Sequence, residues 1–107
     1  MTFEEKKEFC LRAEMLRERV KSTSALSPTD RADAVTGLEA ASMYVRSGIV
    51  RHGVSKLFCE DTASLFRHMS ALKDFSGEER DYFASVAAVL VTIFTPEEKP
   101  GKKRKKK

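Results

Sequence analysis

Apolar residues recur along this chain at the three- and four-residue steps of an α-helix. The clearest face lies near the N-terminus and carries Phe9, Ala13, Leu16 and Val20. A second face carries Val35, Leu38, Ser42 and Val45, widened by Met43 and Tyr44. A third carries Leu57, Phe58, Leu65, Phe66, Met69 and Leu72. These three patterns predict amphipathic helices, each with one face turned to a core.

A fourth segment, roughly residues 78–94, is apolar almost all round. A helix without a polar face is normally buried, so this segment is predicted to form the centre of the core. Its valines and isoleucine would also suit a strand over residues 86–94. Helix is favoured because alanines occupy positions 84, 87 and 88 and a helix start signal precedes the segment.

Helix start signals occur at three places. Thr2 is followed three residues later by Glu5, and the same capping-box spacing recurs at Ser76 and Glu79. Ser27 precedes a proline, which suits an N-cap followed by the first helical residue. Three such signals in 107 residues predict an all-α fold.

Two glycines, Gly48 and Gly53, mark the least certain joint between helices. Glycine is favoured just past a helix end, so the break is placed between residues 48 and 56. The alternative is that the second helix continues through His52 before it ends. In either case the prediction is a small four-helix bundle.

The bundle could consist of two helical hairpins, because the sequence resembles itself at an offset of 49 residues. The pairs are Phe9-Cys10 with Phe58-Cys59, Leu16 with Leu65, Val20 with Met69, Leu26 with Phe75, Ser27 with Ser76 and Arg31 with Arg80. A true repeat would predict hairpins related by a pseudo-twofold axis. The simpler interpretation is that any two amphipathic hairpins align this well.

The charge of the chain is unevenly distributed. The chain has 20 basic and 16 acidic residues, and six of the bases are the last six residues. Without those six, 14 bases face 16 acids, so the remainder carries about −2. Residues 1–95 are therefore predicted to form the helical domain, and the proline- and lysine-rich residues 96–107 a disordered tail.

The remaining composition points to a soluble protein in a reducing compartment. There are two cysteines and no Cys-x-x-Cys motif, which does not fit a secreted disulfide framework. The charged N-terminal residues do not resemble a signal peptide. The longest charge-free stretch, residues 82–96, is shorter than the roughly 20 residues of a membrane span.

The basic tail is the only strong functional motif, and it comprises Lys102, Lys103, Arg104, Lys105, Lys106 and Lys107. A short basic run after a Pro-Gly pair fits a nuclear import signal, which places the protein in the nucleus, with the cytoplasm as the alternative. It would also suit an arm that contacts phosphates of RNA or DNA. The third interpretation is a solubilising tail without a specific partner. A membrane-surface role is disfavoured because no amphipathic helix or lipidation site adjoins the tail.

Candidate chemistry elsewhere is weak. Cys59, Glu60, Asp61 and His68 are the best metal-ligand candidates, but their spacing does not match a zinc site. Catalysis by a Cys–His pair would require Cys59 to approach His52 or His68. No phosphate-binding or nucleophile-elbow motif occurs. We therefore expect no metal, no cofactor and no enzymatic activity, and the cysteines are interpreted as small core residues.

A stripe of small residues, Ala34, Gly37, Ala41 and Gly48 with Ala40 nearby, follows the second helix. It predicts either close packing within the bundle or a groove for a partner helix. Taken together, the sequence favours a small nuclear interaction protein, an adaptor or complex subunit that binds a protein partner. The alternatives are an RNA- or DNA-associated factor and, least favoured, an enzyme without a recognisable motif. The oligomeric state stays open.

Overall fold

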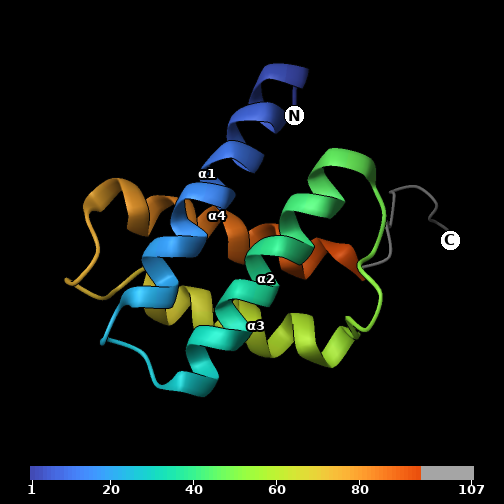
Figure 1. Cartoon of the computed structure of the whole chain (residues 1–107). Helices are drawn as coiled ribbons and strands as arrows, with labels where there is room; N and C mark the ends of the chain where they lie inside the picture. The colour runs from blue at the N-terminus through green and yellow to red at the C-terminus, as the bar shows by residue number, and fades with distance from the viewer. Residues whose placement is uncertain (95–107) are drawn as a thin grey trace, which may run out of the picture.

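A computed structural model describes residues 1–94 and shows four helices in that part of the chain (Figure 1). The helices are α1 (Phe3–Ser22), α2 (Pro28–Ser47), α3 (Lys56–Met69) and α4 (Gly77–Ile93). The predicted all-α fold is confirmed, and residues 86–93 are helical, not a strand. The predicted disorder of the tail lies outside the described residues.

Helices α1, α2 and α4 begin at the capping residues that the sequence predicted. The hydroxyls of Thr2 and Ser76 accept hydrogen bonds from the amides of Glu5 and Glu79, and both capping boxes are complete. Ser27 caps α2 in the same way. A fourth cap, Ser55, begins α3 and is not recognisable in the sequence, because no glutamate or proline follows it at the diagnostic spacing.

The predicted break between α2 and α3 is also confirmed. Gly48 has a φ of 73° and its amide donates to the carbonyl of Tyr44, which ends α2 in a left-handed cap. A residue with a side chain would be strained in that conformation. Gly48 therefore ends α2 as its position indicated, Gly53 lies within the connection with a φ of 87°, and α3 begins at Lys56.

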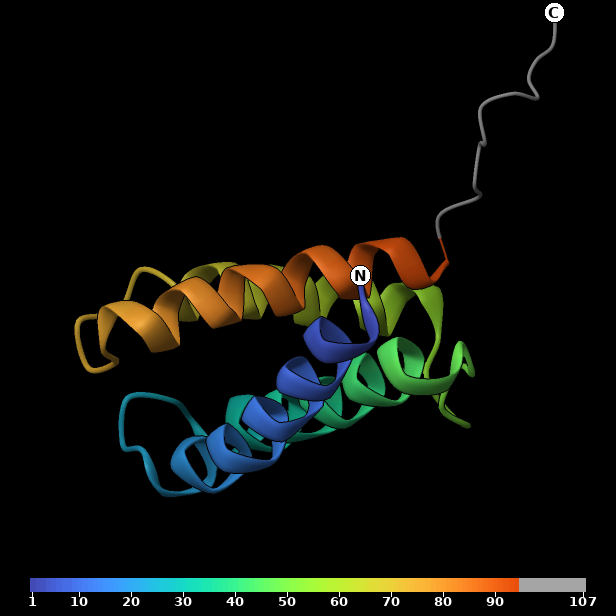
Figure 2. The same cartoon turned by 90° about the horizontal axis from the view of Figure 1, so that it is seen from above.

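The four helices form two layers, each of them a helical hairpin (Figure 2). One layer contains α1 and α2, and the other contains α3 and α4. Between the layers, α2 packs against both α3 and α4. The two hairpins agree with the predicted arrangement.

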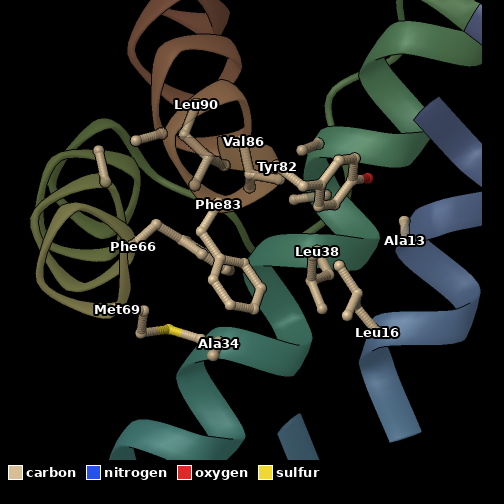
Figure 3. Close-up of a cluster of buried hydrophobic side chains, with 14 of the residues drawn as sticks. Ala13, Leu16, Ala34, Leu38, Phe66, Met69, Tyr82, Phe83, Val86 and Leu90 are labelled. Atoms are coloured by element: carbon tan, nitrogen blue, oxygen red, sulfur yellow. The ribbon is translucent and has the colours of Figure 1, made fainter. Parts of the chain in front are cut away.

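Aromatic side chains fill the space between the layers (Figure 3). The ring of Phe83 on α4 lies 5.7 Å from that of Phe66 and 4.9 Å from that of Phe75, measured between centroids. All three rings are buried. Such tilted and edge-on contacts add to the free energy gained by burying the rings themselves.

The small-residue stripe serves internal packing at its buried members Ala34, Gly37, Ala40 and Ala41, whereas Gly48 is exposed and only ends α2. A Cβ at Gly37 would lie 2.5 Å from Cγ2 of Thr62 and 2.9 Å from Cε2 of Phe66, both on α3. The absence of a side chain at position 37 therefore permits α2 and α3 to approach closely. Of the two interpretations of the stripe, the structure supports packing within the bundle.

Two expectations about buried faces need correction. The apolar pattern predicts that residues 78–94 are buried all round, but α4 buries one face and exposes Ala84, Ser85 and Ala88. The pattern also places Leu57 on the buried face of α3, yet Leu57 is exposed, whereas Thr62 is buried. In both helices the apolar pattern is wider than the face that a four-helix core can cover.

Candidate interaction surfaces

The N-terminal half of α1 carries exposed apolar side chains. Phe3, Leu11 and Met15 keep 75, 53 and 66% of their surface accessible. They are spaced by multiples of four residues, so with Lys7 they lie along one side of the helix. In Figure 1 the first turns of α1 extend past the other helices. We refer to Phe3, Leu11 and Met15 as the α1 stripe.

A groove of about 810 Å³ lies between the N-terminal halves of α1 and α4. Five carboxylates and one guanidinium line it, namely Glu4, Glu5, Glu8, Glu78, Asp81 and Arg12. The lining side chains therefore carry an excess of four negative charges, and the N-terminal ammonium of Met1, which also lines the groove, offsets one of them. We call this feature the acidic groove.

The base of the acidic groove is aromatic and firmly held. The rings of Phe9 and Tyr82 lie 5.1 Å apart between centroids. The Tyr82 hydroxyl donates a hydrogen bond of 2.7 Å to the carbonyl of Phe9. Burial raises the pKa of Tyr82 well above its usual range, so the phenol stays neutral at physiological pH. This contact joins α4 to α1.

The carboxylates of the groove have two kinds of role. Glu5 belongs to a capping box, and Glu8 forms an ion pair of 2.9 Å with Arg12, which raises the pKa of that guanidinium. Glu4, Glu78 and Asp81 form no ion pair within residues 1–94. Acids in the first turn of a helix also interact favourably with its dipole, which accounts in part for Glu4 and Glu78.

A smaller pocket of about 290 Å³ lies between α1 and α2. There the Glu39 carboxylate lies between two guanidiniums, 3.3 Å from Nη1 of Arg17 and 3.5 Å from Nη2 of Arg51. Arg51 belongs to the connection between α2 and α3, so this network ties the connection to α1. Nε of Arg17 is buried and has no hydrogen-bond partner within the described residues. The network is best explained as a structural tie, since Glu39 bridges one nitrogen of each guanidinium and Nε of Arg17 lies 3.9 Å from the Glu18 carboxylate.

The weak metal and catalytic candidates differ in their exposure to solvent. Cys59 is buried, and burial raises the pKa of its thiol, which lowers its reactivity. Glu60, Asp61, His52 and His68 are exposed. Within residues 1–94 no three side chains among His, Cys, Asp and Glu are arranged to hold a metal ion. Cys10 is half-buried, and its sulfur lies 3.5 Å from the carbonyl oxygen of Ser42 as a weak donor.

The basic tail, residues 102–107, lies outside the described residues. The acidic groove could not be found in the sequence because its walls come from α1 and α4, about 70 residues apart. The α1 stripe does leave a signal. Phe3, Leu11 and Met15 fit a second helical face, but the charged residues between them favour an ordinary solvated surface.

None of the four described helices is long and apolar enough to cross a membrane. Comparisons of the chain with protein-family models, curated proteins and solved structures found no match.

Proposed function

We propose that this protein is a small helical interaction module, an adaptor or complex subunit that works in the nucleus. The α1 stripe is the observation that carries the proposal. Three large apolar side chains on one side of a projecting helix gain free energy if a partner covers them. Exposed apolar clusters on helices commonly mark protein-binding sites.

The basic tail supports the nuclear part of the proposal. Residues 102–107 carry six positive charges, whereas the rest of the chain carries about −2. A nucleic-acid-binding domain usually has its own excess of lysine and arginine. The negative body thus favours protein binding over phosphate binding for the helical domain, and leaves import as the role of the tail.

The first experiment tests import. The full chain and a variant lacking residues 102–107 are each fused to a reporter too large to diffuse through nuclear pores. We expect nuclear accumulation of the full chain and loss of that accumulation on truncation. Equal distribution of the two fusions would rule out the tail as an import signal.

The second experiment tests the α1 stripe by affinity capture from nuclear extract. The double variant Leu11→Ser/Met15→Ser is compared with wild type and with Ile49→Ser/Leu57→Ser, which changes two exposed apolar residues outside the stripe. We expect a defined set of proteins to be retained by wild type and by the control, and lost by the stripe variant. Identical capture by all three would argue against the stripe as the binding surface.

The alternative, an RNA- or DNA-associated factor, predicts a different result. Binding of the full chain to a generic duplex would weaken as salt rises, with a slope that reflects several phosphate contacts and disappears on tail removal. If duplex binding is found and the capture experiment is negative, the nucleic-acid function replaces the adaptor function.

A further inference from the structure

The acidic groove and the basic tail are oppositely charged parts of one chain. The groove has four excess negative side-chain charges, and residues 102–107 bring six positive ones. Glu4 and Asp81 have no ion-pair partner within residues 1–94, so they remain available to a cation, whereas Glu78 also interacts electrostatically with Arg12. We propose that the acidic groove binds the chain's own segment 102–107 within the same molecule.

The tail is long enough to reach the groove. From Phe94, the last described residue, back to Asp81 is 13 helical residues, which is about 20 Å at 1.5 Å per residue. The seven residues 95–101 span up to about 25 Å when extended. The basic segment can therefore lie beside the groove without any change in the helices.

The groove suits lysine side chains in more than charge. Its base contains Phe9 and Tyr82 beside the carboxylates. A lysine has an apolar stem and a charged end, so its stem can lie on an aromatic surface while its ammonium meets a carboxylate. Favourable interaction with the helix dipoles accounts for Glu4 and Glu78, which lie in the first turns of α1 and α4. It does not account for Asp81, which lies one turn further along α4.

Binding within the molecule is favoured because the tether holds the tail at a high effective concentration, on the order of millimolar for a short flexible linker. Each contact is weak at the surface and sensitive to salt. The expected state is thus an equilibrium between a bound and a free tail. A tail bound in the acidic groove would be hidden from an import receptor. The receptor and the acidic groove would therefore compete for residues 102–107.

The experiment compares amide NMR spectra of the full chain and of a variant lacking residues 102–107. The comparison is repeated in two charge-reversed backgrounds, Glu4→Lys/Asp81→Lys in the groove and Glu60→Lys/Asp61→Lys on the exposed side of α3. Both pairs change the net charge equally and avoid the capping residues. Because each background has its own truncated reference, shifts caused by the substitutions themselves cancel.

We expect truncation to shift the amide signals around Glu4, Glu8, Asp81 and Ser85 in wild type and in the α3 variant. The shifts should be lost in the groove variant, and also at about 1 M salt, where the Debye length is about 3 Å. They should not depend on protein concentration. Unchanged groove signals at low salt, tail-dependent shifts that map to another surface, or shifts that grow with concentration would each overturn the proposal. The import assay is independent, so a failed import signal and an unoccupied groove give different results.

Discussion

Tyr82 illustrates how a single polar atom is accommodated between two helices. Its ring is buried against Phe9, and its hydroxyl donates to the Phe9 carbonyl at 2.7 Å. A buried hydroxyl without a partner would cost free energy, whereas a satisfied one contributes about 1 kcal/mol. The phenol therefore has to keep its proton for the contact between α1 and α4 to persist.

This requirement predicts a loss of stability at alkaline pH. The pKa of Tyr82 is raised in the folded state by burial, while in the unfolded chain it is near 10. Above about pH 10 the unfolded state releases the proton and the folded state retains it, so the free energy of unfolding falls by up to about 1.4 kcal/mol per pH unit. Below pH 10 the phenol adds no pH dependence.

The variant Tyr82→Phe isolates this effect. It should be less stable by about 1 kcal/mol at neutral pH, because the hydrogen bond is lost. Between pH 10 and 11 it should lose less stability than wild type. Urea unfolding at each pH measures both quantities, and Tyr44→Phe, at a half-buried tyrosine, serves as the control. Parallel curves for wild type and Tyr82→Phe would contradict the assigned cause.

At the scale of elements, α2 and α3 approach each other closely at Gly37, the one glycine within residues 1–94 where an added Cβ would meet neighbouring atoms. Replacing Gly37 with alanine would improve helix propensity by about 1 kcal/mol. The new Cβ, however, would lie 2.5 Å from Thr62 and 2.9 Å from Phe66, and overpacking of this kind costs about 1–3 kcal/mol. Because the closest neighbours belong to a buried threonine and a buried ring, the cost should exceed the gain.

We therefore expect Gly37→Ala to lower the free energy of unfolding by about 1–2 kcal/mol. Gly77→Ala is the matched control, since the position that its new methyl group would take has no neighbouring atom within 4 Å, and it should be neutral or slightly stabilising. Adding Thr62→Ser to Gly37→Ala removes the nearest methyl group and should restore part of the loss. Chemical denaturation measures all three, and equal stability of Gly37→Ala and wild type would show that the helices can separate without cost.

The burial of the helices shows how far their buried faces could be predicted from the sequence. All four residues of the predicted α1 face are buried, because they follow one another at helical steps and α1 packs mainly on one neighbour. In α3 and α4 the apolar residues outnumber the positions that the core covers, so the pattern alone did not identify Leu57 as exposed. The proposed repeat behaves similarly: Ser27 and Ser76 are equivalent caps, but the Phe-Cys pairs differ in which residue is buried.

The candidate surfaces were less predictable than the helices. The apolar face of a helix is formed by residues of one segment, so it can be recognised from their spacing in the sequence. The acidic groove exists only when Glu4 and Asp81 are placed on neighbouring helices, and nothing in either segment specifies the other. The tail is identifiable at once because its six bases are contiguous, yet its proposed binding site required the fold.

At the scale of the whole molecule, burial is distributed unevenly along the chain. Residues 1–8 are all exposed, whereas the buried face of α1 begins at Phe9. The core rings of Phe66, Phe75 and Phe83 belong to the α3–α4 layer and the connection within it. Local opening of the first turns of α1 would therefore expose no buried apolar surface, while opening of α4 would disrupt the core.

Hydrogen exchange of backbone amides should reveal this gradient. We expect Lys6–Glu8 to exchange faster than Ala13–Leu16 by at least about tenfold after correction for intrinsic rates, and Phe83–Leu90 to exchange most slowly. Because the first turns of α1 form one wall of the acidic groove, a bound tail should slow exchange there in the full chain relative to a chain lacking residues 102–107. Equal protection along α1 in the truncated chain would mean that its N-terminal turns open only with the core, and the helix would then present the α1 stripe as a rigid surface.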